Sequence, residues 1–548
     1  MRSIPFYILL LAVFCLGYSL SAQNVSDVWV ADLGNGKYKN PILHADYSDP
    51  DICKVGDDFY MTSSSFNAVP GLPILHSKDL VNWKLIGYAL DELTPEDHFS
   101  KPQHGNGVWA PSIRYHNGEF YIYYGDPDFG IYMVKTKDPA GSWEDPVLVQ
   151  KGKGLIDPCP LWDKDGKAYL VHAFAGSRAG IKSVLVVRRM SPDGTHLLDE
   201  GSIVFDGHGD HPTIEGPKFY KRNGYYYIFA PAGGVPTGWQ TILRSKNVFG
   251  PYEDKIVLEQ GETEINGPHQ GGWVELESGE SWFVHFQDKE AYGRIVHLQP
   301  MKWKNDWPVI GIDKDGDGKG WPVMIHKKPD VKGDHKIVTP EDSDEFNSIS
   351  LANQWQWHAN PKASWAFTNA AAGKLRLYTV QSPDKSDNLW NVPNLLLQKF
   401  PAEEFTVTTK LSFSFNDEIT NEKIGLVIMG EDYAHLNLTS KSDGVYLSYG
   451  ERQNARTGGE EITKNITKLN TDEIYLRVTV IDGGKCQFSY SKNGKKFIDI
   501  DEVFTARPGR WIGAKVGLFA IRNQRINDSG YADFEWFRFE PVDKEQEY

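Results

Sequence analysis

The sequence has very little cysteine and no excess of positive charge, and both absences limit what the protein can be. Only 4 of the 548 residues are cysteine, and Cys15 lies in a segment that we expect to be removed. Cys53, Cys159 and Cys486 remain, an odd number that favours buried thiols over a disulfide framework, although pairing of Cys53 with Cys159 stays open. The formal net charge of -15 argues against a nucleic-acid partner, because such binding needs a basic surface.

Long apolar runs are also missing, except at the N-terminus. Met1-Arg2 precede an apolar run over residues 4–16, and the small residues Ser21 and Ala22 follow. This pattern predicts a signal peptide over residues 1–22, and hence a protein exported to the periplasm or secreted. No other segment is apolar over the ~20 residues that a membrane-spanning helix needs, so we expect no membrane span.

Aromatic residues, in contrast, are plentiful. The chain has 17 Trp, 26 Tyr and 27 Phe. Aromatic side chains are enriched in β-strands, and their flat faces stack on sugar rings. The composition therefore favours β-structure and a neutral, carbohydrate-like partner. At 548 residues the chain is too long for one core, so we expect at least two domains.

One pattern occurs five times in the first part of the chain. Each copy has a short polar residue or glycine, then proline, an apolar strand, a hairpin turn and an aromatic-rich strand. The spacing of about 45 to 60 residues leaves room for four strands per copy, which predicts a five-bladed β-propeller over residues 36–325. An irregular sandwich would not explain a proline at the head of every copy, where no ladder donor is lost. The copies begin at Ser48-Asp49-Pro50, Trp109-Ala110-Pro111, Ile156-Asp157-Pro158, Glu215-Gly216-Pro217 and Asn266-Gly267-Pro268.

The second part of the chain is again all-β but has no repeat at this spacing. A polar stretch over residues 326–341 is expected to be a linker. Beyond it, alternation in Leu375-Arg376-Leu377-Tyr378 and Val516-Gly517-Leu518-Phe519 predicts a two-sheet β-sandwich over residues 342–548. The predicted fold class is therefore all-β, with a propeller followed by a sandwich.

Acidic residues stand at the head of three of the five repeats. The inner strands of all blades line one axis, so Asp49, Asp157 and Glu215 are expected to converge there, with His269 just after Pro268. Carboxylates that converge repel one another, which favours a function for them. Hydrolysis of a glycosidic bond needs two: one protonates the leaving oxygen, and the other activates water or attacks the carbon. A third carboxylate nearby raises the pKa of the acid by like-charge repulsion.

These motifs resemble those of glycoside hydrolase family 43. The resemblance runs in order from about Asp46 to Val323. The C-terminal part resembles the jelly-roll, concanavalin-like sandwich of the β-xylosidase and arabinofuranosidase members. The motifs that carry the resemblance are Ser48-Asp49-Pro50-Asp51, Val55-Gly56-Asp57-Asp58-Phe59-Tyr60, Pro70-Gly71-Leu72-Pro73, the stretch His76 to Trp83, Trp109-Ala110-Pro111, Ile156-Asp157-Pro158, Glu215-Gly216-Pro217, Gly293-Arg294 and Leu298-Gln299-Pro300.

The resemblance implies an exo-acting, inverting glycosidase that acts on oligosaccharides. It implies Asp49 as the general base, Glu215 as the general acid and Asp157 as the carboxylate that orients this acid and tunes its pKa. Arg294 resembles the family's arginine near the sugar hydroxyls, and His269 its histidine on the propeller axis. The resemblance implies no cofactor for catalysis. It does imply a structural calcium near His269, although proline precedes His269 where the family has Gly-His-Gly.

Two aromatic residues are candidates for substrate contacts. Trp109 is either a wall of the sugar pocket or a packed blade residue. Many β-xylosidases of the family have a tryptophan where this chain has Phe66-Asn67-Ala68-Val69-Pro70. This departure favours release of α-L-arabinofuranosyl units from arabinoxylan, arabinan or xyloglucan side chains. The alternatives are a β-D-xylosidase, a bifunctional enzyme and, more distantly, a sugar-binding protein without activity. Linkage and oligomeric state stay open.

Other polar groups are interpreted as structural. Asp313, Asp315 and Asp317 resemble the start of a calcium loop, but Met324 stands where the bidentate glutamate of an EF-hand would lie, so we interpret the segment as a turn. Five further residues are interpreted as turn, strand-end or loop residues: Asp51, Asp57, His44, His104 and His208.

Overall fold

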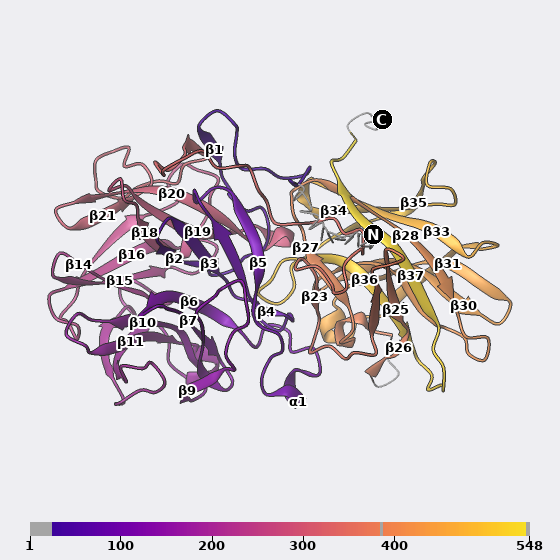
Figure 1. Ribbon diagram of the computed structural model, residues 1–548, viewed down its shortest axis with the longest axis horizontal. Helices are drawn as coiled ribbons and strands as arrows, with labels where there is room; N and C mark the ends of the chain where they lie inside the picture. Colours follow the sequence, from indigo (N-terminus) through magenta and orange to yellow (C-terminus); the bar gives the residue numbers. More distant parts are fainter. Residues whose placement is uncertain (1–24, 384–386, 544–548) are drawn as a thin grey trace, which may run out of the picture.

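The structure is a computed structural model that describes residues 25–383 and 387–543. Two all-β bodies lie side by side in Figure 1, the propeller from indigo to pink and the sandwich from orange to yellow. The prediction of a propeller followed by a sandwich is confirmed. The predicted signal peptide lies outside the described residues. No helix within them is long and apolar enough to cross a membrane.

Each of the five repeats forms one four-stranded antiparallel sheet in chain order. The first blade consists of β2 (Asp51–Val55), β3 (Asp58–Thr62), β4 (Gly71–Ser77) and β5 (Trp83–Leu90). The first strands contact one another around the ring, and β2 also contacts β18 of the last blade. The other blades are β6 (Trp109–His116), β7 (Glu119–Asp126), β8 (Gly130–Thr136) and β9 (Val147–Lys151); β10 (Leu155–Trp162), β11 (Ala168–Phe174), β12 (Val184–Met190) and β13 (Ser202–Asp206); β14 (Lys218–Arg222), β15 (Tyr225–Ala232), β16 (Trp239–Ser245) and β17 (Glu253–Leu258); β18 (His269–Glu275), β19 (Ser281–Asp288), β20 (Arg294–Lys304) and β21 (Trp307–Ile310).

The hairpin turns follow from their residues. Asn117-Gly118 and Asn223-Gly224 have φ values of 50° and 86°, and of 50° and 78°. Two consecutive positive φ angles define the type I′ turn, whose twist matches that of the strands it joins. Asparagine and glycine tolerate this geometry better than other residues. The first two strands of these blades are therefore brought together by local chemistry.

The segment before the first blade closes the ring against the last one. β1 (Lys37–Lys39) pairs with β22 (Ile325–Lys327), and Leu43 forms a bridge with Val296 of β20. The side chains of Tyr38 and Asn40 donate hydrogen bonds to the carbonyl of Leu298, at 2.8 and 2.9 Å. The beginning and the end of the propeller are thereby held together.

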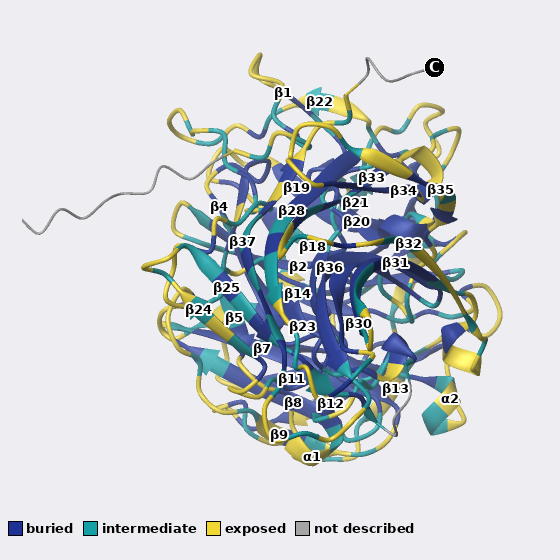
Figure 2. Ribbon diagram, turned by 90° about the vertical axis from the view of Figure 1, so that its right-hand side faces the viewer, coloured by how far each residue is buried: buried dark blue, intermediate teal, exposed yellow. Residues whose placement is uncertain are grey.

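The sandwich consists of two large sheets with one core between them. In Figure 2 its strands are dark blue along much of their length, while many of its loops are yellow and exposed. One sheet has the order β23 (Gln356–Trp357), β27 (Leu396–Lys399), β36 (Lys515–Arg522), β29 (Lys423–Met429), β30 (Tyr433–Lys441), β31 (Gly444–Arg452) and β32 (Glu461–Lys468), with β26 (Val380–Gln381) also on β36; the other has the order β24 (Ala366–Asn369), β25 (Lys374–Tyr378), β37 (Tyr531–Glu540), β28 (Phe405–Ser414), β33 (Glu473–Ile481), β34 (Lys485–Ser491) and β35 (Ile498–Thr505).

Direct hydrogen bonds join the two domains. The turn η1 (Glu290–Tyr292), between β19 and β20, projects into the sandwich, where the Tyr292 hydroxyl donates to the Glu403 carbonyl at 2.9 Å and accepts from the Gly484 N–H at 3.1 Å. The Ala514 N–H donates to the Ala291 carbonyl at 2.7 Å. The sandwich is thus docked beside the last blade rather than tethered at a distance.

The three cysteines of the described chain agree with the expectation of buried thiols. Cys53, Cys159 and Cys486 are all free and buried. Cys159 instead accepts hydrogen bonds from the Arg114 side chain at 3.0 Å and from the Phe219 N–H at 3.2 Å.

Candidate active site

The backbone kinks at the residue before the proline of every repeat. This residue has a positive φ in all five: Asp49 at 54°, Ala110 at 33°, Asp157 at 57°, Gly216 at 59° and Gly267 at 45°. The register of the first hairpin also shifts at this residue in blades two and three, whereas in blade five it shifts between His269 and Gly271, just after the proline. Such a bulge re-aims a side chain out of the regular alternation of a strand. Proline therefore marks more than a strand start, because the kink before it turns the side chains of Asp49, Ala110 and Asp157 away from the regular pattern.

Glu215 lies one residue before the position that Asp49 and Asp157 occupy. The equivalent residue in its blade is Gly216, whose N–H donates a hydrogen bond to the Asp157 carboxylate at 2.7 Å. Asp157 is 2% exposed, whereas 32% of the Glu215 side chain reaches solvent. The register offset therefore leaves Glu215 open to an incoming molecule and keeps Asp157 behind it.

Asp49 is held by two polar side chains, those of Ser64 and Arg294. Ser64 donates a hydrogen bond from its hydroxyl to Asp49 at 2.6 Å, and itself accepts one from the Ala110 N–H at 2.7 Å. Arg294 donates from Nη1 to both carboxylate oxygens, at 3.1 and 3.3 Å, and to the Ser48 hydroxyl at 3.0 Å. These groups fix the direction of the carboxylate and balance its charge.

The electrostatics keep a proton on the Glu215 and Asp157 pair. Burial raises the pKa of Glu215, and the nearby charges of Asp157 and Asp49 raise it further, while Arg294 lowers it. Burial also raises the pKa of Asp157, which the hydrogen bond from Gly216 partly offsets. A carboxyl group that stays protonated near neutral pH can serve as a general acid.

His269 lies beside this acid. Its Nε2 is 3.7 Å from Oε1 of Glu215, and its side chain is fully buried. Burial and the charge of Arg294 lower the pKa of His269 to about 3, so the ring is neutral. A neutral imidazole leaves the carboxyl group without a cationic partner on this side, which favours its protonated form.

Aromatic rings surround the charged groups. Trp109 contacts Phe66 at a ring distance of 6.4 Å, and the guanidinium of Arg178 lies 5.7 Å from the Trp109 ring. Phe66 is only 2% exposed, so it supports Trp109 from behind rather than forming an open wall. Trp511 of the sandwich lies 6.4 Å from the Trp109 ring, and its own ring is 6.0 Å from the Arg294 guanidinium.

Two residues of this site have no signal in the sequence repeat. Ser64 follows the second strand of its blade, and only its contacts reveal its link to Asp49. Trp511 is 43% exposed and lies in the loop between β35 and β36, more than two hundred residues after Arg294. A tryptophan in a polar loop outside any strand pattern could have been noted as unusual, but its destination depends on how the domains dock.

A calcium ion near His269 is implied only by the resemblance of the sequence. Calcium binds six to eight oxygen atoms, mostly from carboxylates and carbonyls. Within the described residues, the one group of three His, Cys, Asp or Glu side chains that converges to within 4.8 Å is Asp313, Asp315 and Asp317. A calcium ion near His269 therefore stays a prediction, which metal analysis of the purified protein tests.

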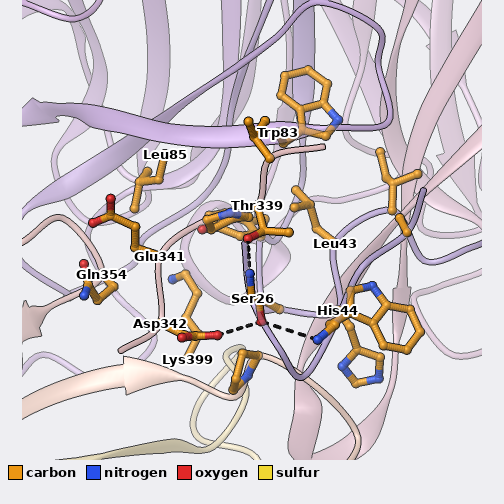
Figure 3. Close-up of a pocket in the computed structure, with 18 of the residues that line it drawn as sticks. Ser26, Leu43, His44, Trp83, Leu85, Thr339, Glu341, Asp342, Gln354 and Lys399 are labelled. Atoms are coloured by element: carbon orange, nitrogen blue, oxygen red, sulfur yellow. Dashed lines mark hydrogen bonds between the residues drawn. The ribbon is translucent and has the colours of Figure 1, made fainter. Parts of the chain in front are cut away.

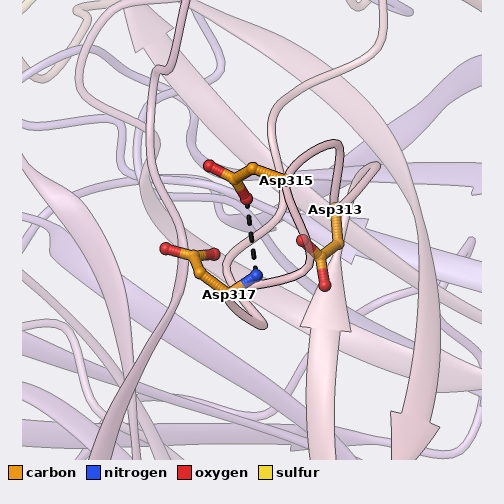
Figure 4. A group of neighbouring side chains, drawn as sticks. All are labelled: Asp313, Asp315 and Asp317. Carbon is orange, nitrogen blue, oxygen red and sulfur yellow. Dashed lines mark hydrogen bonds between the residues drawn. The ribbon is translucent and has the colours of Figure 1, made fainter.

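The Asp313 loop is held by its own contacts (Figure 4). Asp313 accepts hydrogen bonds from the N–H groups of Gly316 and Gly318, at 2.7 and 3.1 Å, and Asp315 accepts one from Asp317 at 3.4 Å. The ammonium of Lys319 lies 2.9 Å from the Asp317 carboxylate. These contacts agree with our interpretation of the segment as a turn.

The residues interpreted as structural have structural contacts. The fully buried Asp51 forms an ion pair with the partly exposed Arg114 at 2.6 Å, so Asp51 joins the first two blades in addition to standing at a strand end. His104 stacks on Trp390 of the sandwich at 3.5 Å. His208 is exposed and lies 2.6 Å from Asp206.

The partly open cavity shown in Figure 3 is not lined by Asp49, Asp157 or Glu215. It measures about 70 Å³ and lies between the N-terminal segment, the first blade and the sandwich. Ser26 crosses it with hydrogen bonds to Thr339 and Asp342, at 2.8 and 2.6 Å. His44, expected in a loop, is 2% exposed and lines this cavity, so its role is in domain packing.

Comparisons with known proteins agree with this geometry. The model of the glycosyl hydrolases family 43 matches residues 38–308, and that of the beta xylosidase C-terminal concanavalin A-like domain matches residues 343–540. The chain is 33% identical to a beta-xylosidase of Formosa agariphila, over 93% of this chain and 91% of that protein. It is 29% identical to a non-reducing end alpha-L-arabinofuranosidase of Bacteroides ovatus, over 94% and 97%. Among solved structures, xylan beta-1,4-xylosidase of Bacillus halodurans is similar with a TM-score of 0.80 and 25% identity, over 92% of this chain and 99% of that one.

Proposed function

Because the chain belongs to glycosyl hydrolase family 43, we propose that it is an inverting exo-glycosidase that removes single β-D-xylosyl units from the non-reducing ends of xylan oligosaccharides. The similarity to a beta-xylosidase over 93% of the chain supports this substrate. The three converging acids support catalysis over mere sugar binding, since a binding protein has no use for a protonated Glu215 near a second carboxyl group.

Asp49 is the proposed general base. Its carboxylate takes a proton from a water molecule as that water attacks the anomeric carbon. Ser64 and Arg294 hold the carboxylate in one direction, which the displacement requires because the water must approach opposite the leaving group. Arg294 also presents positive charge to the sugar hydroxyls and to the base at once.

Glu215 is the proposed general acid. Its proton passes to the glycosidic oxygen as the bond to the anomeric carbon breaks, and the sugar leaves with inverted configuration. Asp157 acts through Glu215: its charge raises the pKa of that group, and both Asp157 and His269 restrict the direction of the carboxyl group. Asp157 is thus a positioning residue, and no step needs a cofactor.

We infer the exo mode from the residues that enclose one side of the site. Trp109 and Trp511 approach from different domains, and Arg294 lies between the sandwich loop and Asp49. A site enclosed on this side admits the end of a chain more readily than its middle. The two rings meet edge to face at 6.4 Å and together form one aromatic wall, against which a pentose ring can pack.

An α-L-arabinofuranosidase is the second candidate, and the similarity to the Bacteroides ovatus enzyme favours it. The sequence favours this candidate because a tryptophan is missing near Phe66. Phe66 lies behind Trp109, so that position does not decide the shape of the pocket. The order of the two candidates is therefore reversed.

One experiment tests the proposal directly. The values of kcat/KM for 4-nitrophenyl β-D-xylopyranoside and α-L-arabinofuranoside are compared, with Asp49→Asn as the inactive control. We expect the xyloside to be preferred and its product to appear first as the α-anomer in proton NMR. A higher value for the arabinofuranoside favours the second candidate, and retention of configuration contradicts the assigned roles.

Export to the periplasm or the medium is part of the proposal and rests on the N-terminal sequence pattern alone. N-terminal sequencing of the protein recovered from cell fractions tests it, and we expect cleavage near Ala22.

A further inference from the structure

A single buried carboxylate connects the two domains next to the site. Asp46 is 5% exposed. Its Oδ1 accepts a hydrogen bond from the Arg294 N–H at 3.0 Å, and its Oδ2 accepts one from the Gly513 N–H, also at 3.0 Å. The first donor belongs to the last blade and the second to the loop between β35 and β36 of the sandwich. The carboxylate therefore bridges propeller and sandwich through main-chain atoms.

The two backbones are in contact at this point. A Cβ atom on Gly293, whose φ is 74°, would lie 2.6 Å from the Gly513 nitrogen and 2.7 Å from Cγ of Asp46. A Cβ atom on Gly513 would lie 2.8 Å from the carbonyl carbon of Tyr292. Because both positions leave no room for a side chain, the spacing between the two segments is set by backbone contact and by Asp46.

Each segment carries a group of the site. Arg294 places its guanidinium 3.1 Å from Asp49, and the Tyr47 N–H binds the Arg294 carbonyl at 3.1 Å, so its main chain is fixed at both polar atoms. Trp511 precedes Gly513 by two residues and lies beside Trp109 and Arg294. A displacement of Asp46 would thus move Arg294, which holds the base Asp49, relative to Trp511.

Asp46 is also the anion that favours the charged form of two nearby lysines, the buried Lys515 and the half-buried Lys399. Lys515 is 6% exposed, and it and Lys399 both donate to Oε1 of Gln356, at 3.4 and 3.2 Å. Both ammonium groups are favoured by the negative charge of Asp46. A neutral residue at position 46 would leave them without a counter-charge in the domain junction.

We propose that Asp46 is a positioning residue that fixes the Trp511 loop of the sandwich against Arg294, and so makes the sandwich part of the active site. The inference rests on the proposed function. Asp46 itself touches neither substrate nor reacting atoms.

The main test is Asp46→Asn. Asparagine keeps the shape but presents an NH₂ group to one of the two N–H donors, so one bridge is lost. Well below the melting temperature we expect kcat/KM to fall about ten- to a hundredfold on the aryl xyloside, since misplacement of about 1 Å costs that much. Asp344→Asn is the matched control, because Asp344 also accepts two N–H groups, from Phe346 and Trp355, but lies within the sandwich. It should keep kcat/KM within about twofold.

A double-mutant cycle with Trp511→Ala tests the coupling. If Asp46 acts through the Trp511 loop, the double variant loses less activity than the product of the single losses. The ¹⁹F NMR signal of 5-fluorotryptophan at position 511, assigned with Trp511→Phe, should also shift in Asp46→Asn and not in Asp344→Asn. Asp46→Glu keeps the charge and both acceptors one methylene further out, so it should recover part of the activity and serves if Asp46→Asn does not fold.

The outcomes separate this inference from the proposed function. If wild type hydrolyses a pentoside and Asp49→Asn does not, but folded Asp46→Asn or Asp46→Glu keeps full kcat/KM with an unshifted Trp511 signal, the inference is overturned and the function stands. If wild type hydrolyses neither pentoside, the proposed function fails. A shift of the Trp511 ¹⁹F signal in Asp46→Asn would then still support the role of Asp46 in fixing the Trp511 loop. Strict multiplicativity in the cycle contradicts coupling through the loop.

Discussion

Ser64→Ala is the substitution whose effect follows most directly from the contacts around the base. The hydroxyl donates to Asp49 at 2.6 Å, accepts from the Ala110 N–H at 2.7 Å and is 3% exposed. Alanine removes one hydrogen bond to a charged group, and such bonds contribute about 1.5–3 kcal/mol. At about 1.4 kcal/mol per factor of ten, kcat should fall roughly 10- to 150-fold.

The assay uses two substrates that differ in their leaving groups, an aryl β-xyloside and xylobiose. Because the base acts on water and not on the leaving group, both should lose the same factor. Ser63→Ala is the matched control, since Ser63 is fully buried but donates only to the carbonyl of Ser64, at 3.5 Å. A loss below threefold in Ser64→Ala, or a loss confined to xylobiose, would refute the role of Ser64 in holding the base.

Three further predictions concern the acid and the domain junction. Glu215→Gln should abolish cleavage of xylobiose but spare much of the activity on aryl glycosides with good leaving groups, which a comparison of kcat for both substrates measures. Asp157→Asn should move the alkaline limb of the pH profile of kcat/KM to lower pH by about one unit. Activity is lost on this limb as Glu215 loses its proton, and the charge of Asp157 raises the pKa of Glu215. An alkaline limb at unchanged pH contradicts this prediction. Burial lowers the pKa of Lys515 from 10.5 to about 7. The free energy of unfolding is therefore reduced by up to about 5 kcal/mol below pH 7, where Lys515 is charged in both states, and is not reduced above pH 10.5, where it is neutral in both. Lys515→Met should therefore raise the melting temperature by several degrees at pH 6 and by much less at pH 10, as calorimetry at both pH values shows.

The propeller could be predicted because its repeats are local in sequence. Each copy carries its own proline and hairpin turn, and fivefold repetition makes convergence on one axis a matter of symmetry. The meeting of Asp49 with Asp157 and Glu215 follows from that symmetry alone. The one-residue offset of Glu215 from its proline is visible in the sequence, but the greater exposure of Glu215 than of Asp157 is not, because it depends on the left-handed kink at Gly216.

Contacts made between the domains could not be predicted in the same way. Trp511 lies in a loop with no periodicity, and its approach to Arg294 depends on the docking of two separately folded bodies. Phe66 shows a related limit: the sequence places it near the pocket, but only packing decides that Trp109 stands in front of it. The preference for a xyloside over an arabinofuranoside rests instead on the named relatives.

The left-handed kink before each proline limits which side chains the axis can carry. Outside glycine, asparagine and aspartate enter this backbone region most readily, because their short polar side chains compensate locally for its steric cost. The φ values of 54° at Asp49 and 57° at Asp157 thus suit carboxylates at no special expense to the backbone. Replacement by asparagine changes charge alone at these two positions, whereas alanine or a longer acid would disturb the main chain as well. The backbone at such a kink therefore accepts aspartate readily, but space decides whether a blade can hold one: at Gly216 a Cβ atom would lie 2.5 Å from Cγ of the buried Gln270, so that blade leaves no room for a new carboxylate.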